Sequence, residues 1–112
     1  MANLENNNFS SETLALHAAY NYDSQRTLSV PIYQSTAYSF ESIGQAAARF
    51  GLQELGNIYS RLTNPTVDVL AQRLAAVEGG AFGVATSSGS AALFYTFVNL
   101  AQNGDNILYA NK

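Results

Sequence analysis

The sequence contains no cysteine, and its 112 residues include a single histidine and a single lysine. The absence of cysteine excludes disulfide bonds, thiolate metal sites and a cysteine nucleophile. The histidine is His17, and a lone histidine is more often a surface or packing residue than a metal ligand. The lysine is Lys112, the last residue of the sequence. Chemistry that requires a lysine therefore has one candidate position here.

Charged residues are also scarce, at 12% of the sequence with a net charge of −3. The five basic residues are scattered singly, so the sequence has no electrostatic footprint for nucleic acid or for an anionic membrane. No apolar run is long enough to span a bilayer, and the polar start MANLENNNFSSE lacks the basic and apolar regions of a secretion signal. We therefore expect a soluble cytoplasmic protein.

Apolar residues, in contrast, make up 47% of the sequence. A chain of this length suffices for one small domain with a core, but not for two. Small domains expose a large share of their surface, so this fraction is high. We expect part of the apolar surface to meet another chain or a further part of the same polypeptide.

Residues 82–101, which read FGVATSSGSAALFYTFVNLA, are the most informative stretch. A short apolar run at 82–86 precedes Ser87, Ser88, Gly89 and Ser90, and an apolar segment of helical length follows, which predicts a strand, a tight turn and a helix. The first N–H groups of a helix lack intrahelical partners and carry the positive end of the helix dipole. The stretch therefore fits an anion site, most often a phosphate site.

The same residues also fit a serine cap on a buried helix that binds no ligand, and this stretch alone does not separate the two interpretations. The lysine of a Walker motif is absent, as is the G-x-G-x-x-G spacing of dinucleotide-binding proteins.

The amino-terminal half predicts short helices joined by an extended segment. Residues 1–9 carry four asparagines and are expected to be disordered or loosely docked. Ser10 or Ser11 can cap a helix that reaches about Ala19, with Leu14 and Ala18 on one face. Residues 20–40 have neither helical period nor strict alternation, which is typical of an arm lying across a surface.

Two further helices are predicted before the informative stretch. Residues 41–50 are alanine-rich, with Ser39 or Ser42 near their start and Gly51 after their end. Asn64, Pro65 and Thr66 then combine a capping asparagine with a proline in the first turn. The apolar positions that follow form one stripe of a helix, and they are Val67, Leu70, Ala71, Leu74 and Val77. This helix is predicted to end at Gly79 and Gly80.

The carboxyl-terminal end predicts a turn at residues 103–105 and a second strand at 106–110. The order helix, strand, helix, strand favours an α/β fold with a parallel sheet and crossover helices. Two strands are too few for such a sheet, so we expect these residues to be the beginning of a larger domain.

Three stretches together resemble the amino-terminal part of the Cys/Met-metabolism family of pyridoxal-phosphate enzymes. They are TLALHAA at 13–19, GNIYSRLTNPT at 56–66 and EGGAFGVATSSGSAA at 78–92. Within the family, the run FGLQELGNIYSRLTNPT is most similar to the O-acetylhomoserine sulfhydrylases. The resemblance covers nearly all of the chain after Ser10, and its YSR-x-x-NPT part is the most specific.

The resemblance implies the large domain of a type I aminotransferase-like fold, pyridoxal 5'-phosphate as cofactor, and a homotetramer built from dimers that share active sites across the dimer interface. Residues 1–58 would form an arm that reaches the neighbouring subunit, and residues 59–112 would begin the cofactor-binding domain. The implied partners are the protein itself and a small amino-acid substrate.

Carried over residue by residue, Gly89 and Ser90 match the backbone N–H donors that hold the cofactor phosphate, with Ser88 beside them. Tyr59 and Arg61 match a pair that reaches the phosphate held in the neighbouring subunit. This agrees with the chemistry of arginine, which forks onto phosphate oxygens. Tyr59 also has a possible role near the reacting part of the substrate.

The sequence departs from the family pattern at two points. Position 90 is serine where many relatives carry methionine or glutamine, although a main-chain role tolerates that change. The family also needs a Schiff-base lysine, an aspartate facing the pyridine nitrogen and a stacked aromatic ring. All three lie beyond Lys112 in the family pattern, so no catalytic residue is expected in this chain and the chain alone is expected to be inactive.

Three hypotheses remain open at this point. The first is a γ-replacement enzyme that converts O-acetylhomoserine and sulfide to homocysteine and acetate in methionine biosynthesis. The second is a cystathionine γ-synthase or a methionine or cystathionine γ-lyase of the same family. The third is a non-catalytic phosphate-binding or interaction module, which leaves the joint spacing of Tyr59, Arg61 and the glycine turn unexplained.

Overall fold

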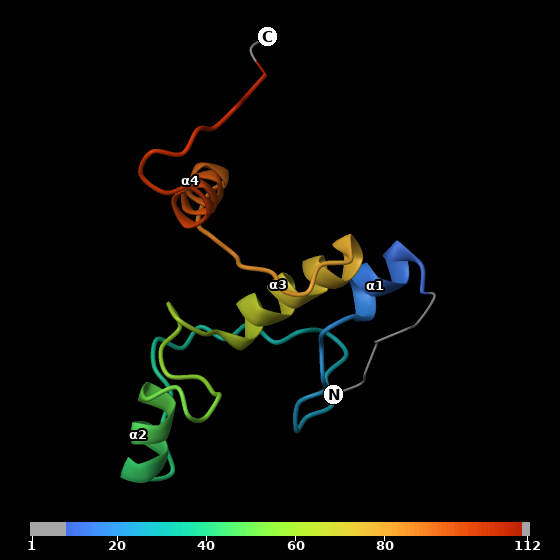
Figure 1. The fold of residues 1–112 in the computed structure, drawn as a ribbon. Helices are drawn as coiled ribbons and strands as arrows, with labels where there is room; N and C mark the ends of the chain where they lie inside the picture. The colour runs from blue at the N-terminus through green and yellow to red at the C-terminus, as the bar shows by residue number, and fades with distance from the viewer. Residues whose placement is uncertain (1–8, 111–112) are drawn as a thin grey trace.

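The computed structural model of the protein describes residues 9–110, which contain four helices (Figure 1). They are α1 (Ser11–His17), α2 (Ile43–Phe50), α3 (Pro65–Glu78) and α4 (Gly89–Leu100). All four lie where the sequence predicts a helix. The prediction of a loosely docked start falls mainly on residues 1–8, which are outside the described residues, as is Lys112.

Each helix begins at a polar residue whose side chain accepts a hydrogen bond from the first turn. The four caps are Ser10, Ser42, Asn64 and Ser88. The structure therefore selects Ser10 over Ser11 and Ser42 over Ser39. At its other end, α3 stops at Gly79, whose φ of 68° lies in the left-handed region that glycine adopts without strain. These local features form as predicted because they depend on neighbours in sequence.

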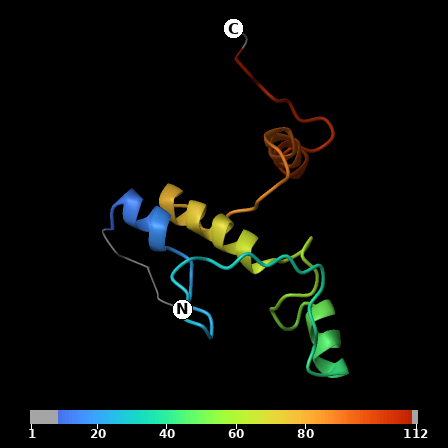
Figure 2. The ribbon, with the colours of Figure 1, turned by 180° about the vertical axis from the view of Figure 1, so that it is seen from behind.

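The small core of the described residues lies between α1 and α3, which run side by side at the carboxyl-terminal end of α3 (Figures 1 and 2). Ala18, Ala71 and Ala75 are its buried apolar residues. The guanidinium of Arg73 closes the contact by donating from Nε to the carbonyl oxygen of Ala18 at 2.9 Å. The helices approach closely because the facing side chains are small.

The predicted apolar stripe of α3 is therefore only partly correct. Leu70 and Leu74 remain 53% and 55% exposed, whereas the buried line is Ala71 and Ala75, and Ala75 was not part of the predicted stripe. A side chain at Gly83 would clash with the Ala71 carbonyl oxygen. The absence of a side chain at Gly83 thus lets the segment after α3 fold back along the helix.

The two predicted strands do not form within the described residues. Residues 82–86 and 106–110 have no regular secondary structure, and the one strand-like pairing is an isolated antiparallel bridge between Ala37 and Tyr59. A strand is stabilised by hydrogen bonds to a neighbouring strand, and no such neighbour pairs with these segments here. The turn before the second segment does form, with Gly104 at φ 100°.

The described residues are extended, with a radius of gyration of 17.6 Å. A compact domain of 100 residues has a radius of gyration of about 13 Å. Helix α4 stands apart from the other three helices in both views, and its apolar side chains are largely exposed (Figures 1 and 2). No helix between residues 9 and 110 is long and apolar enough to cross a membrane.

Candidate functional site

The turn that carries Tyr59 and Arg61 ends at Asn64, whose side chain is buried and fully hydrogen-bonded. Its Oδ1 accepts from the N–H groups of Thr66 at 3.0 Å and Val67 at 3.4 Å, which caps α3. Its Nδ2 donates to the carbonyl oxygen of Tyr33 and to the hydroxyl of Ser60, both at 3.0 Å. One side chain therefore joins the helix, the turn and the segment at residue 33.

Thr66 adds a second connection between α3 and the extended segment at 31–33. Its hydroxyl donates to the carbonyl oxygen of Pro31 at 2.8 Å and accepts from the N–H of Tyr33 at 2.9 Å. The Asn-Pro-Thr sequence was predicted to fix the start of a helix. The structure shows that it also holds residues 31–33 onto that start, as expected for an arm lying across a surface.

The extended segment continues as a short antiparallel pairing with the residues around Tyr59. The N–H of Tyr38 donates to the carbonyl oxygen of Ile58 at 3.2 Å, and the N–H of Ser60 donates to the carbonyl oxygen of Thr36 at 2.9 Å. The hydroxyl of Ser60 also donates to the carbonyl oxygen of Ser35. The backbone on both sides of Tyr59 is thus fixed to the arm.

Tyr59 and Arg61 are brought together by this turn. The Cζ of Arg61 lies 5.4 Å from the centre of the Tyr59 ring, and its Nη2 donates to the Tyr59 hydroxyl at 3.3 Å. The guanidinium is exposed, so its remaining N–H donors can bind an external oxyanion. A cavity of about 520 Å³ lies beside the pair, lined by apolar side chains that include Phe40, Phe50 and Ile58.

Ser88, Gly89 and Ser90 form the first turn of α4. The hydroxyl of Ser88 accepts from the N–H of Ala91 at 3.1 Å, so this cap leaves the N–H groups of Gly89 and Ser90 without an intrahelical partner. The first turn contains no acidic residue, and no atom within 4 Å occupies the space where Gly89 would carry a side chain. This end of α4 is therefore open to an anion.

The structure does not join these two groups of residues. Between residues 9 and 110, no hydrogen bond or ion pair links Tyr59 or Arg61 to residues 87–90. The same residues contain no cluster of three or more histidine, cysteine, aspartate or glutamate side chains that could hold a metal ion. His17 is exposed in the last turn of α1, as predicted for a surface residue.

Sequence reasoning missed Ser60 as a residue that fixes the turn, gave Thr66 a role only at the start of α3, and missed Arg49. Their partners are Ser35, Pro31 and Glu54, of which the first two lie 25 and 35 residues away in sequence. The Asn-Pro-Thr sequence was the available signal for Thr66, but a contact at this separation has no periodic pattern to reveal it.

Asp68, one turn into α3, has its pKa raised by burial.

Residues 12–112 match the family described as Cys/Met metabolism PLP-dependent enzyme. The chain is 58% identical over 99 residues to O-acetyl-L-homoserine sulfhydrylase 1 of Thermus thermophilus, covering 87% of this chain and 23% of that protein. It is 50% identical over 98 residues to the homocysteine synthase of Schizosaccharomyces pombe, again covering 87% of this chain and 23% of the relative.

A crystal structure of a putative O-acetylhomoserine (thiol)-lyase from Campylobacter jejuni superposes with a TM-score of 0.82 at 71% sequence identity. The superposition covers 88% of this chain and 24% of that one, and the crystal structure contains N'-pyridoxyl-lysine-5'-monophosphate. The chain therefore spans about a quarter of the length of the relatives that it matches.

Proposed function

Because this chain belongs to the Cys/Met metabolism family of PLP-dependent enzymes, we propose that it forms the amino-terminal part of an O-acetylhomoserine sulfhydrylase. The reaction is the conversion of O-acetyl-L-homoserine and sulfide to L-homocysteine and acetate, a step of methionine biosynthesis. The observation that carries the proposal is the 71% identity to the Campylobacter jejuni protein, together with the sulfhydrylase and homocysteine synthase names of the other relatives.

The proposal includes the organisation of the complete protein. Residues 1–58 form an arm that reaches the neighbouring subunit, and residues 59–112 begin the cofactor-binding domain of a type I aminotransferase-like fold. Two dimers assemble into a homotetramer in the cytoplasm. The exposed apolar side chains of α4 support a larger domain around this helix, because an apolar helix face is stable when another part of the protein covers it.

The first turn of α4 suits the phosphate of the cofactor. Gly89 and Ser90 offer backbone N–H groups at the positive end of the helix dipole, and the open space at Gly89 admits an oxyanion close to the backbone. We assign these two residues to phosphate binding, with Ser88 fixing their geometry through its bond to Ala91. The absence of acidic residues from this turn avoids repulsion of the phosphate.

Tyr59 and Arg61 are assigned to the phosphate held in the neighbouring subunit. Both belong to one hydrogen-bonded turn. Within the described residues, no hydrogen bond or ion pair joins them to residues 87–90 of their own chain, which agrees with a role in another subunit. Arg61 supplies positive charge and forked donors, and Tyr59 supplies a hydroxyl donor with a further role on the substrate side.

When bound, pyridoxal phosphate supplies an electron sink for the reaction, and the lysine that holds it is expected beyond Lys112. The residues of this chain bind and orient. Asn64 and Thr66 fix the turn of Tyr59 and Arg61, and Ser88 fixes the first turn of α4. We assign the acid and base steps to residues outside this chain.

The substrate assignment is tested on the complete protein with O-acetylhomoserine plus sulfide and, separately, with cystathionine. We expect homocysteine and acetate from the first pair, and little product from cystathionine. Product from cystathionine alone would instead place the protein with the γ-lyases of the same family. The complete protein should also show the visible absorption of a lysine-bound cofactor, and borohydride should abolish that absorption. Absence of this absorption would contradict the enzyme assignment and favour a non-catalytic phosphate-binding module.

The shared site is tested by complementation between two inactive variants. Arg61→Ala removes the guanidinium, and Gly89→Asp places a carboxylate where the phosphate should bind. The new Cβ at position 89 meets no atom within 4 Å. A mixed dimer has one site free of both changes, so co-expression should restore part of the activity. No restoration would show that Arg61 acts within its own chain.

A further inference from the structure

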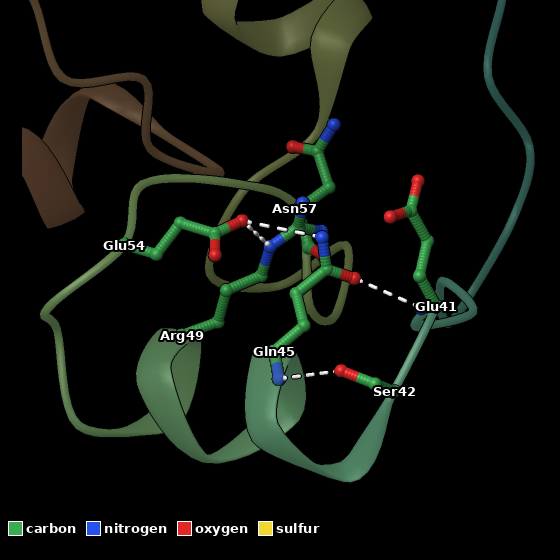
Figure 3. Close-up of polar contacts among 6 residues, drawn as sticks. All are labelled: Glu41, Ser42, Gln45, Arg49, Glu54 and Asn57. Atoms are coloured by element: carbon green, nitrogen blue, oxygen red, sulfur yellow. Dashed lines mark hydrogen bonds and ion pairs between the residues drawn. The ribbon is translucent and has the colours of Figure 1, made fainter.

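Arg49, in the last turn of α2, connects that helix to the loop that leads to Tyr59 (Figure 3). Its Nε donates to Oε1 of Glu54 at 3.0 Å in an ion pair, and its Nη1 donates to the carbonyl oxygen of Asn57 at 3.4 Å. The exposed fractions of the two paired side chains are 19% for Arg49 and 41% for Glu54. This ion pair is thus partly shielded from solvent, unlike an ordinary surface pair.

The guanidinium of Arg49 is also enclosed by groups from two other segments. Its Cζ lies 5.9 Å from the centre of the Phe40 ring, which belongs to the extended segment at 20–40. On the loop, Gly56 lies so close that an added Cβ would stand 2.5 Å from Cζ and from Nε. One side chain therefore holds α2, the extended segment at 20–40 and the loop together.

Gln45, one turn earlier on α2, reinforces the same contact (Figure 3). Its Nε2 donates to Oε1 of Glu54 at 3.3 Å, and its Oε1 accepts from the N–H of Glu41 at 2.9 Å. The carboxylate of Glu54 is consequently fixed by two side chains of α2. The loop has little freedom at its middle as long as both bonds persist.

The contacts of Arg49 lie directly next to those that fix Tyr59. Asn57 precedes Ile58, whose carbonyl oxygen accepts from Tyr38, and Phe40 follows Tyr38 by two residues. Phe40 also lines the cavity shared with Tyr59 and Arg61. A displacement of the guanidinium would therefore reach both sides of the pairing that carries Tyr59.

We propose that Arg49 is a positioning residue for the cofactor phosphate, which acts by fixing the loop and hence the direction of Tyr59 and Arg61. The inference rests on the proposed function, because it requires that Arg61 reaches a phosphate. Lysine cannot replace arginine here, since it lacks the planar fork that bonds to both Glu54 and Asn57 and lies over the Phe40 ring.

The first test compares Arg49→Lys with Arg73→Lys in the complete protein. Arg73 is the matched control, because it makes one part-buried bond to Ala18 far from the loop. We expect Arg49→Lys to weaken pyridoxal phosphate binding by about tenfold. This is the effect of losing one charge-assisted hydrogen bond between Arg61 and the phosphate. Binding of pyridoxal, which lacks the phosphate, should stay unchanged, and Arg73→Lys should change neither affinity.

A second readout uses the cofactor-free protein. Hydrogen exchange of the backbone amides at Tyr38 and Ser60 should speed up in Arg49→Lys, because both amides donate within the pairing that Arg49 fixes. The same amides should stay protected in Arg61→Ala, since the side chain of Arg61 bonds to the Tyr59 hydroxyl and not to the backbone of the pairing. Unchanged exchange in Arg49→Lys would overturn the proposal, whatever the cofactor affinities are.

The steric contact is tested with Gly56→Ala. The φ of Gly56 lies outside the left-handed region, so alanine can adopt its backbone conformation, and the new Cβ would displace the guanidinium. We expect Gly56→Ala to weaken pyridoxal phosphate binding as Arg49→Lys does, and to have no further effect in an Arg49→Ala background. Gly44→Ala is the matched control, because its Cβ would meet only Ser42 Oγ at 3.7 Å.

The outcomes separate this inference from the proposed function. If Arg61→Ala leaves pyridoxal phosphate binding unchanged, Arg61 does not reach the phosphate, and the site assignment fails. If Arg61→Ala weakens binding and Arg49→Lys does not, the inference alone fails. Equal losses for pyridoxal and pyridoxal phosphate, or additive losses of Arg49→Lys and Arg61→Ala, would also overturn it, because they indicate a general structural role.

Discussion

Replacing Asn64 tests how strongly one side chain fixes the turn that carries Tyr59 and Arg61. Asn64 is 8% exposed and makes four hydrogen bonds, two as acceptor and two as donor. Asn64→Ala removes all four, whereas Asn64→Asp keeps the two acceptor contacts to α3 and loses the donors. The two substitutions therefore separate the helix cap from the contact with the arm.

The expected magnitudes follow from these bonds. Loss of a helix N-cap costs about 1 kcal/mol. Each neutral donor bond, to Tyr33 and to Ser60, contributes about 1 kcal/mol more. Asn64→Ala should therefore lower the local free energy of opening by about 3 kcal/mol, and Asn64→Asp by about 2 kcal/mol, because the aspartate retains the cap.

The assay is native-state hydrogen exchange on the complete cofactor-free protein, which reports the free energy of local opening without requiring global two-state unfolding. The amides of Tyr33 and Thr66 report on the two sides of Asn64. Ser42→Ala is the matched control, since Ser42 caps α2 with a single bond to the N–H of Gln45 and should cost about 1 kcal/mol.

The reasoning would be refuted if Asn64→Ala cost no more than Ser42→Ala. In that case the two donor bonds would add nothing, and the arm would be held by other contacts. A loss in Asn64→Asp equal to that of Asn64→Ala would also contradict the separation of cap from arm, because it would leave the cap without measurable value.

Two further predictions concern the helix starts. Gly89→Ala should leave the melting temperature unchanged or raise it, because the new Cβ meets no atom within 4 Å and alanine favours a helix. Binding of pyridoxal phosphate should weaken, and unaltered binding in a titration would contradict the phosphate assignment. In α1, hydrogen bonds from a backbone N–H and from the side chains of Ser10 and Ser11 lower the pKa of Glu12 from its ordinary value of 4.5. The charged Glu12 therefore stabilises the start of α1 above pH 4.5, and this stabilisation is lost as the pH falls through the pKa of the folded state. An NMR titration of Glu12 should show this midpoint, exchange of α1 amides should speed up below it, and Glu12→Gln should abolish that pH dependence.

Features that depend on near neighbours could be predicted from the sequence. Each helix starts at a serine or asparagine whose side chain bonds to an N–H two or three residues later, and α3 ends at a glycine with positive φ. These interactions lie within one helical turn, so residue type and spacing are sufficient to identify them. The open first turn of α4 at Gly89 follows from the same local rules.

The strands predicted at 82–86 and 106–110 are not confirmed within the described residues, and the cause is physical. An apolar run with suitable residues marks a segment that can pair, but pairing requires a neighbouring strand. The described residues supply none, so these segments remain without regular structure. The stripe of α3 was only partly correct for a related reason. Helix periodicity identifies an apolar face but does not tell which of Leu74 and Ala75 meets α1.

For the candidate site, the sequence alone determined which residues are present and which local shapes they take: Tyr59 and Arg61 before a capped helix, and Ser88 to Ser90 at the start of another. Only the tertiary structure decided how the first pair is held. Asn64 and Thr66, at the start of α3, bond to residues 31–33, and Arg49 of α2 bonds to the loop before Tyr59. The reason is that sequence patterns encode contacts within a few residues, whereas the position of Arg61 depends on contacts between segments that are distant in sequence.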